Sequence, residues 1–497
     1  MFLDKQVRSD DDALQHVYSH FRQNLEDIAR NGCRAKANVI FCTIASNLKD
    51  CPPFASLHRL GIAEAQKRRW EEIYEEGVEY ERAEKYGQAI EKYLSADAID
   101  NLYADLQFRL GRCYWRIGEY EEAKTRYILA RELDTLRFRA DDRINEIVRD
   151  IASNKTADGV YLVDAVKVFE QNSPHQTPGE ELFYEHVHMN FKGNYLLAMT
   201  VFEKVEQIIP EKIRCQKADD YQPFSEAQCA KRLAYTDWSL YKIAEAIHST
   251  SEKLPYSNQL YHDERFAQAE KEVQALKSEL TPNVLQDIVA QYRNAIQSSS
   301  KDWLLHKQFA LMLTEGLKDY AGAAKQYQLL LKQSNYYAAH VDLGGILLTM
   351  GNIEEGAAHS REAIRIKPTC AEAYCNLANV YEMLHKTDKA VKYYYKTLRL
   401  RPDYLSAYAS FIQIMIRNGR IEEAVEMYRK TLPFIKTPAL KVATHIKIGD
   451  LLVEHGRTDE AISELNTALQ IDPNSIECRK RLEAFFGALH GRQGEGY

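Results

Sequence analysis

The stretch AEAYCNLANVYEMLHKTDKAVKYYYKTLRLRP, residues 371–402, decides most of the fold. Its small and aromatic residues recur 34 positions further along the chain. The pairs at this spacing include Ala373 and Ala407, Tyr374 and Tyr408, Ala390 and Ala424, Tyr394 and Tyr428, and Pro368 and Pro402. Each proline follows a second apolar run, where a helix is expected to stop. The spacing therefore predicts stacked helix pairs, because many positions keep one register.

The same period is present near the N-terminus and again near the C-terminus. Two units 34 residues apart share the pairs Gly77 and Gly111, Ala89 and Ala123, and Tyr93 and Tyr127. A final unit, offset by three residues, carries Gly449, Gly456, Ala461, Ala468 and Pro473. The pattern resembles the tetratricopeptide repeat family over about residues 69–134 and 300–485. This resemblance implies a mainly α chain in which an α-α superhelix binds a protein or peptide.

The inner helices of such an array line a concave groove. The positions predicted to face it are Glu372, Cys375, Asn376, Asn379, Glu382 and Gln413. Neighbouring units do not continue an asparagine ladder, because Asp342 and Ser410 stand at the positions that match Asn376. The units also lack a lysine and arginine set that would hold a terminal carboxylate. The sequence therefore predicts a protein or peptide ligand without giving its class.

Outside the repeats the chain alternates between helix and strand patterns. Residues 11–32 read as an amphipathic helix, and we expect Gly32 to end it. Residues 39–44 form a short apolar run typical of a buried parallel strand. A second helix at 144–152 and a second strand at 159–163 follow the first repeat pair. The alternation predicts a small α/β region, in which functional residues gather at the carboxyl ends of strands.

An acid and a histidine stand close together shortly after the second strand. Glu185 precedes His188 by three residues, so a tight turn would bring the carboxylate to the imidazole. A histidine acts as a general base when an acid orients it and a nucleophile lies within reach. Ser46 and Ser56 flank the loop after the first strand, where serine is more often a turn former. Whether the pair has a nucleophile decides whether the chain is an enzyme.

A zinc site is the alternative use of this segment. It would combine Glu185, His186 and His188, but no further cluster of ligands accompanies them. His186 alternates with His188, so in an extended segment the two rings face opposite ways. We therefore expect no metal and no cofactor.

The acid-x-x-His block followed by a helix resembles the last block of the SGNH (GDSL-type) hydrolases. Glu185 stands where that family usually has aspartate. The similarity covers about residues 1–205. It is to a subset of the family that carries an inserted tetratricopeptide pair. It implies that His188 is the base and Glu185 its orienting acid in an esterase or acyltransferase, often one that acts on O-acetyl carbohydrate.

The family's nucleophile and oxyanion blocks set the limit of that expectation. A Gly-Asp-Ser block and a Gly-x-Asn block are absent from residues 1–40. We therefore expect a repeat scaffold fused to an incomplete module that is inactive alone. The alternatives are an active serine hydrolase, if upstream residues supply both blocks, and a pure interaction protein with a structural α/β remnant.

Composition narrows the class of protein further. The net charge of −7 and the pI near 6.1 argue against a nucleic-acid partner. No apolar run is long enough to span a membrane. Nine scattered cysteines fit free thiols in a reducing compartment, so a cytoplasmic location is the expectation for this chain. The expected segments are 1–68 and 135–205 (SGNH-like α/β), 69–134 (inserted repeat pair), 206–299 (helical connector), 300–485 (repeat array) and 486–497 (flexible tail).

Overall fold

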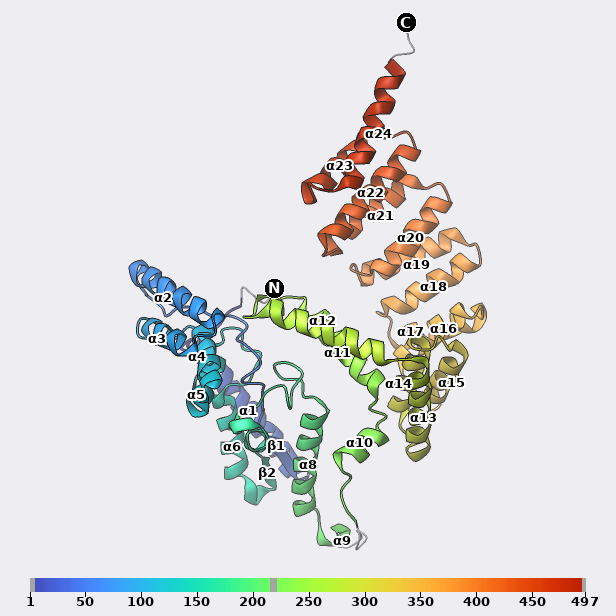
Figure 1. Cartoon of the computed structure of the whole chain (residues 1–497). Helices are drawn as coiled ribbons and strands as arrows, with labels where there is room; N and C mark the ends of the chain where they lie inside the picture. The colour runs from blue at the N-terminus through green and yellow to red at the C-terminus, as the bar shows by residue number, and fades with distance from the viewer. Residues whose placement is uncertain (1–4, 215–220, 494–497) are drawn as a thin grey trace. The chain divides into compact units, whose positions relative to one another are not determined.

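Helices dominate the computed structural model of this chain, which describes residues 5–214 and 221–493 (Figure 1). The predicted class, mainly α with a small parallel sheet, is confirmed. Two compact units are present: the first ends at Gln291 and the second begins at Tyr292. Cys215 and residues 494–497, for which we predicted a thiol and a tail, lie outside the described residues.

The first unit holds a two-stranded parallel sheet. Strand β1 (Val39–Cys42) pairs with β2 (Val160–Val163), and Val39 lies opposite Val160. Helices α1 (Ala13–Arg34) and α6 (Asp142–Asn154) pack on the sheet. The shared core consists of Ala29, Phe41, Ile147, Val148, Ile151 and Val160. Parallel strands require a long crossover connection, and here that connection contains a complete group of helices.

The prediction that Gly32 ends the first helix was wrong, because α1 continues to Arg34. The glycine serves close packing instead. A Cβ atom at position 32 would lie 2.2 Å from Cγ2 of Val39, the first residue of β1. Only a residue without a side chain lets the helix approach the strand this closely.

Besides α6, four α-helices lie within the crossover between the strands. They are α2 (Glu64–Arg82), α3 (Tyr86–Asp97), α4 (Ala104–Ile117) and α5 (Tyr120–Leu133). A Cβ at Gly77 would lie 2.5 Å from the ring of Tyr93, and one at Gly111 would lie 2.8 Å from the ring of Tyr127. Each glycine of the period thus makes room for the tyrosine of the paired helix.

The rest of the first unit consists of shorter helices and connecting turns. In chain order these are η1 (Thr156–Asp158), α7 (Ala165–Gln171), η2 (Pro174–Gln176), α8 (Phe191–Ile208), α9 (Glu211–Arg214), α10 (Glu226–Arg232), α11 (Asp237–Ser251), η3 (Tyr256–Asn258) and α12 (His262–Glu279). Helix α13 (Pro282–Ser298) contains the boundary between the two units.

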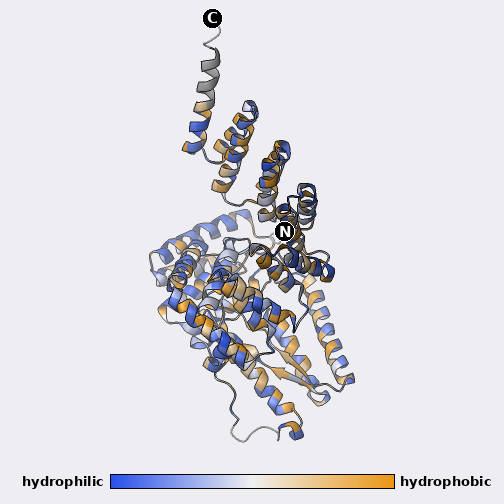
Figure 2. Ribbon diagram, turned by 90° about the vertical axis from the view of Figure 1, so that its right-hand side faces the viewer, coloured by the Kyte–Doolittle hydropathy of each residue, from blue (hydrophilic) through white to orange (hydrophobic). Residues whose placement is uncertain are grey.

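The second unit is a series of helix pairs. Its helices are α14 (Trp303–Glu315), α15 (Tyr320–Leu331), α16 (Tyr337–Thr349), α17 (Ile353–Ile366), α18 (Ala371–Met383), α19 (Thr387–Leu400), α20 (Leu405–Arg417), α21 (Ile421–Thr431), η4 (Leu432–Phe434), α22 (Pro438–Glu454), α23 (Thr458–Ile471) and α24 (Ile476–Gln493). Hydrophobic and hydrophilic residues alternate along these helices (Figure 2). Three residues of the 34-residue period, Ala390, Tyr394 and Ala407, are fully buried between the pairs.

One segment at the C-terminal end differs from expectation. We predicted a flexible tail over residues 486–497, but α24 is helical as far as Gln493. The residues from Phe486 to Leu489 include Ala488, and alanine and leucine are strong helix formers.

Candidate functional site: an acid–histidine turn and a repeat groove

The acid–histidine segment is a tight turn before α8. Phe183 and Met189 form an isolated antiparallel bridge, and the amide of Tyr184 donates to the carbonyl of His188 at 2.8 Å. A Cβ at Gly193 would lie 2.3 Å from the carbonyl oxygen of Leu182. The glycine therefore allows the first turn of α8 to lie directly against this segment.

Glu185 is the centre of the turn. Its carboxylate accepts hydrogen bonds from the amides of His186 at 2.7 Å and His188 at 2.8 Å. It also accepts one from Nδ1 of His188. The Glu185 side chain is 12% exposed, whereas that of His188 is 78% exposed. A proton held at Nδ1 leaves Nε2 of His188 as the basic nitrogen, which is the arrangement of an oriented general base.

His186 belongs to the interior. Its ring packs edge-on against Phe54, at 5.1 Å between centroids, and against Tyr256, at 5.7 Å. Glu185 also lies against Nδ1 of His186, which favours the charged ring. Burial and the nearby Arg139 outweigh this and lower the pKa of His186 to about 4. His186 is therefore a neutral packing residue at pH 7.

Neither of the two serines considered as nucleophiles bonds to the acid–histidine pair. Oγ of Ser56 accepts from the amide of Asp105 at 2.9 Å, so it supports the start of α4. Oγ of Ser46 is buried and has no hydrogen-bond partner within the described part of the chain. No serine hydroxyl of the described residues bonds to His188. The structure thus brings acid and base together without a nucleophile on the imidazole.

Polar residues missed as a group by the sequence analysis fix the ends of the two strands. Asn145 on α6 accepts from the amide of Ile44 at 2.7 Å and donates to its carbonyl at 3.2 Å. Asp164 accepts from Thr43 at 2.9 Å and from two nitrogens of Arg149 at 2.9 and 3.1 Å. Burial would raise the pKa of Asp164, but these hydrogen bonds hold that pKa below its ordinary value. For Asp164 the signal was its place directly after the apolar run at 159–163, whereas Asn145 lies within a helix and carries no such signal.

The predicted groove residues of α18 are largely bonded within the array. Oδ1 of Asn379 accepts from the hydroxyl of Tyr394 at 2.6 Å, and Glu382 accepts from the same hydroxyl at 2.9 Å. Glu382 also pairs with Arg417 of the next unit. Asn376 donates to the carbonyl of Val341 at 2.9 Å. The contacts with Arg417 and Val341 hold one repeat on the next, whereas the bonds to Tyr394 lie within one repeat.

The remaining three groove candidates divide between core and surface. Cys375 is only 7% exposed and belongs to the core between the helix pairs. Glu372 pairs with Arg401 at 2.6 Å. Gln413 is exposed on α20. Of the six, Gln413 is the side chain most free to meet a ligand.

Three histidines of the array, which the sequence analysis missed, occupy equivalent places. Each bonds through Nδ1 to the paired helix: His306 to Gln326 at 2.8 Å, His340 to His359 at 2.8 Å, and His445 to Glu464 at 2.7 Å. Each stands four residues before the small residue that the period places in its helix, namely Ala310, Gly344 and Gly449. That fixed offset was the available signal.

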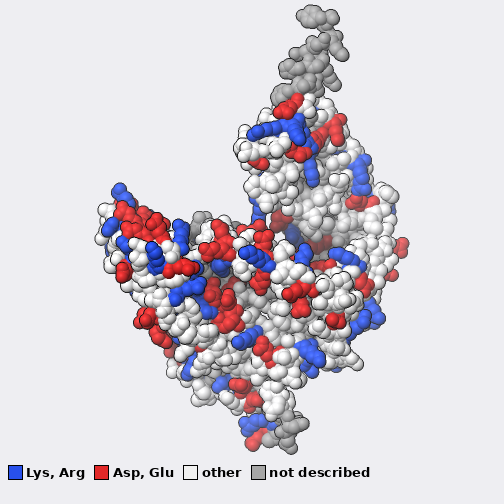
Figure 3. Space-filling model, in the orientation of Figure 1, with Lys and Arg blue, Asp and Glu red and all other residues white. Residues whose placement is uncertain are grey.

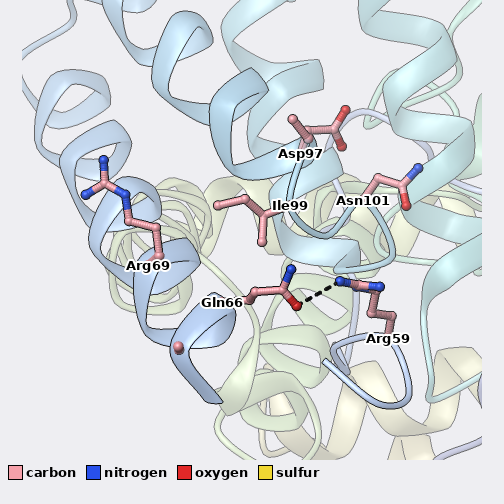
Figure 4. Close-up of a pocket in the computed structure, with 8 residues that line it drawn as sticks. Arg59, Gln66, Arg69, Asp97, Ile99 and Asn101 are labelled. Carbon is pink, nitrogen blue, oxygen red and sulfur yellow. Dashed lines mark hydrogen bonds between the residues drawn. The ribbon is translucent and has the colours of Figure 1, made fainter. Parts of the chain in front are cut away.

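A separate open pocket lies beside the start of α2 (Figure 4). It has a volume of about 740 Å³ and is lined by Arg59, Ala65, Gln66, Arg69, Asp97, Ala98, Ile99 and Asn101. Arg59 donates to Oε1 of Gln66 at 3.2 Å. Asp97 accepts from Arg126 at 3.0 Å and from Gln107 at 2.6 Å, so its charge is balanced from behind the pocket.

Other classes of site find little support in the described residues. No group of three or more His, Cys, Asp and Glu side chains is placed there to hold a metal ion. No described helix is long and apolar enough to cross a membrane. Lys and Arg side chains are interspersed with Asp and Glu on the face drawn in Figure 3.

Family comparison settles the nature of the helix pairs. Models described as tetratricopeptide repeat match residues 74–128, 371–404 and 442–475. The chain contains tetratricopeptide repeats at these residues. The predicted repeats are confirmed at the matched residues, which lie in both units. The resemblance of the surrounding α/β region to SGNH hydrolases stays a hypothesis.

Solved structures similar to this chain include MamA, with 23% identity, coverage of 32% of this chain and 92% of that chain, and a TM-score of 0.28. YrrB, whose title describes a TPR protein with an unusual peptide-binding site, has 16% identity, coverage of 39% and 97%, and a TM-score of 0.29. PilF of Pseudomonas aeruginosa has 17% identity, coverage of 43% and 96%, and a TM-score of 0.31. No curated protein matches the chain.

Proposed function

We propose that this tetratricopeptide repeat protein is an interaction scaffold whose second unit binds a protein or peptide segment along its inner helices. The observation that carries the proposal is the unbroken series of helix pairs from α14 to α23, matched to the repeat family at residues 371–404 and 442–475. In such a series the inner helices form one continuous surface. Gln413 offers an exposed amide on that surface.

Site-specific photocrosslinking tests this proposal on the full chain. A photoreactive amino acid at Gln413 is expected to capture a partner protein, and the same residue at Lys392, exposed on α19, the second helix of the preceding pair, is the control. Capture that is equal at both positions, or confined to Lys392, would contradict groove binding.

A second function rests on Glu185 and His188. We propose that residues 1–205 outside the repeats are the later part of an SGNH-like ester hydrolase or acyltransferase module. The hydrogen bond between Glu185 and Nδ1 of His188 supports it, because that bond leaves Nε2 ready to accept a proton from a serine. The serine and the oxyanion asparagine would come from residues upstream of Met1, and O-acyl carbohydrate is the proposed substrate class.

The module is proposed to be inactive in this chain alone. Hydrolysis of 4-nitrophenyl acetate by the chain is expected to equal that of His188→Ala. Turnover that disappears in His188→Ala but persists in His186→Phe would show that a nucleophile is already present. If the gene extends upstream of Met1, the longer protein is expected to react with a fluorophosphonate serine probe, and the failure of that reaction would leave only the scaffold.

A further inference from the structure

One segment of the first unit ends against the inner helices of the inserted repeat pair. We call residues 254–261, between α11 and α12, the strap. Apart from the short turn η3, the strap has no regular structure, and it ends at Tyr261 with a left-handed φ of 58°. The inner helices of the inserted pair are α2 and α4.

Tyr261 is held by a cluster of charged side chains. Its hydroxyl donates to Glu81 on α2 and accepts from Arg109 on α4 at 3.2 Å. The guanidinium of Arg112 lies 3.8 Å from the centre of the tyrosine ring, close enough for a cation–π contact. Glu81 is 7% exposed and also bonds to Arg109 at 2.7 Å. This is a built pocket for a phenol: a buried acceptor for its hydroxyl and cations over its face.

The residues before Tyr261 are anchored one by one. Leu260 packs with Tyr261 against a cluster that contains Leu48, Phe108 and Tyr127. Gln259 is buried, and its Nε2 donates to the carbonyl of Pro52 at 2.7 Å. Side-chain anchors on an irregular backbone are how an extended peptide occupies a groove, whereas a packed loop buries its apolar residues in its own core.

The start of the strap reaches the acid–histidine turn. The ring of Tyr256 lies 5.4 Å from that of Phe54 and 5.7 Å from that of His186. Its hydroxyl lies 3.5 Å from Nδ1 of His186. His186 is the neighbour of Glu185, so the strap connects the repeat groove to the turn that carries the catalytic candidates.

We propose that the inserted repeat pair, together with the loop at Pro52, is a recognition groove for a Gln-Leu-Tyr peptide, that the strap fills this groove in cis, and that release of the strap loosens the acid–histidine turn. A tethered ligand has an effective concentration of about millimolar, so it excludes weak competitors until it is released. The carboxylate and guanidinium groups around Tyr261 give the groove its specificity for the tyrosine at the end of this tripeptide. The inserted pair is thereby an occupied binding module rather than a passive insertion.

A competition experiment on the full chain tests the proposal. The probe is a fluorescent peptide with the sequence of residues 252–263, and its binding is followed by anisotropy. The double variant Gln259→Ala, Tyr261→Ala is expected to reach saturation at a probe concentration below about 1 mM. That value is the effective concentration of the tethered strap that the variant releases. Wild type and the control Glu270→Gln, exposed on α12, are expected to bind at least about tenfold more weakly.

Either of two results would overturn the proposal. Equal binding to wild type and double variant, or no binding to a folded double variant at about 1 mM peptide, rules out an exchangeable groove. A probe peptide with alanine in place of its tyrosine is expected to lose binding. If the double variant fails to fold, Tyr261→Phe replaces it: this variant keeps the ring and removes the hydrogen bond to Glu81.

Hydrogen exchange gives the link to the acid–histidine turn. In Tyr261→Phe, amides of residues 254–261 and 184–189 are expected to exchange faster than in wild type, and the unlabelled peptide is expected to restore protection only in α2 and α4. Faster exchange of the strap with no change at 184–189 would refute the link to the turn.

Discussion

His340 on α16 and His359 on α17 face each other with their Nδ1 atoms 2.8 Å apart. One ring donates and the other accepts, so at least one must be neutral. Burial lowers the pKa of both histidines, and for His340 the neighbouring His359 lowers it further. Glu362 acts in the opposite direction on both rings and Glu355 does so on His359, but burial outweighs these carboxylates.

We expect this pair to make the second unit sensitive to acid. Because the folded-state pKa values lie below those of the unfolded chain, the unfolded state binds more protons as pH falls below about 6.5. Stability is therefore present above that pH and is lost as the pH falls toward the folded-state values. We expect thermal unfolding of the second unit to shift to lower temperature between pH 7.5 and pH 5.

His359→Gln is the matched variant for that pH dependence. It copies the pair of His306 with Gln326, which keeps a hydrogen bond across the helices without a second titrating ring. The variant is expected to unfold at a temperature that depends less on pH than that of wild type, by calorimetry. An unchanged pH dependence would show that other groups control the acid response.

Gly77 and Gly87 provide a paired test of the repeat packing. A Cβ at Gly77 would lie 2.5 Å from the ring of Tyr93, whereas one at Gly87 meets nothing within 4 Å. Gly77→Ala is expected to destabilise the first unit by about 1–3 kcal/mol through overpacking. Gly87→Ala is expected to stabilise it by up to about 1 kcal/mol, because alanine is the better helix former. Urea unfolding followed by tryptophan fluorescence measures both, and equal effects would argue against the close contact.

These glycines also show how much of the fold could be predicted from the sequence. Gly77 and Gly111 kept the 34-residue period because each needs room for a tyrosine, so the period read the packing directly. Gly32 has the same cause, a close contact with Val39, but it has no repeat to reveal it and was mistaken for a helix end. A contact between distant segments leaves no local pattern when it occurs once.

The candidate site was predictable to a similar degree. The spacing of Glu185 and His188 sufficed to expect a turn that joins them, because three residues form a local structure. The strap contact between Tyr261 and Glu81 joins residues 180 positions apart, and nothing near Tyr261 in the sequence indicates it. Cys375 lies on the inner helix and was expected to face the groove, but it is buried. Its burial depends on the neighbouring helix pair.

Asn145 is expected to be essential for the α/β region. It is 1% exposed and bonds to both the amide and the carbonyl of Ile44, directly after β1. Asn145→Ala leaves both backbone groups without this partner, at a cost of about 1–3 kcal/mol. Asn154→Ala, at the end of the same helix, is the control and is expected to stay within about 0.5 kcal/mol of wild type. Unfolding by urea distinguishes the two, and equal losses would contradict the role of the Ile44 bonds.

Glu185 and His188 are expected to differ in what they contribute to folding. The carboxylate of Glu185 accepts from the amides of His186 and His188 and so holds the turn together. Glu185→Ala removes those bonds and is expected to destabilise the first unit by about 1–3 kcal/mol. His188 is 78% exposed, so His188→Ala is expected to change stability by no more than about 0.5 kcal/mol. If His188→Ala stays folded, a loss of turnover in any longer form of the chain reports on chemistry. If it unfolds, the loss reports on folding. If His188→Ala instead unfolds as readily as Glu185→Ala, the ring is a structural part of the turn, and the proposed role as a general base loses its support.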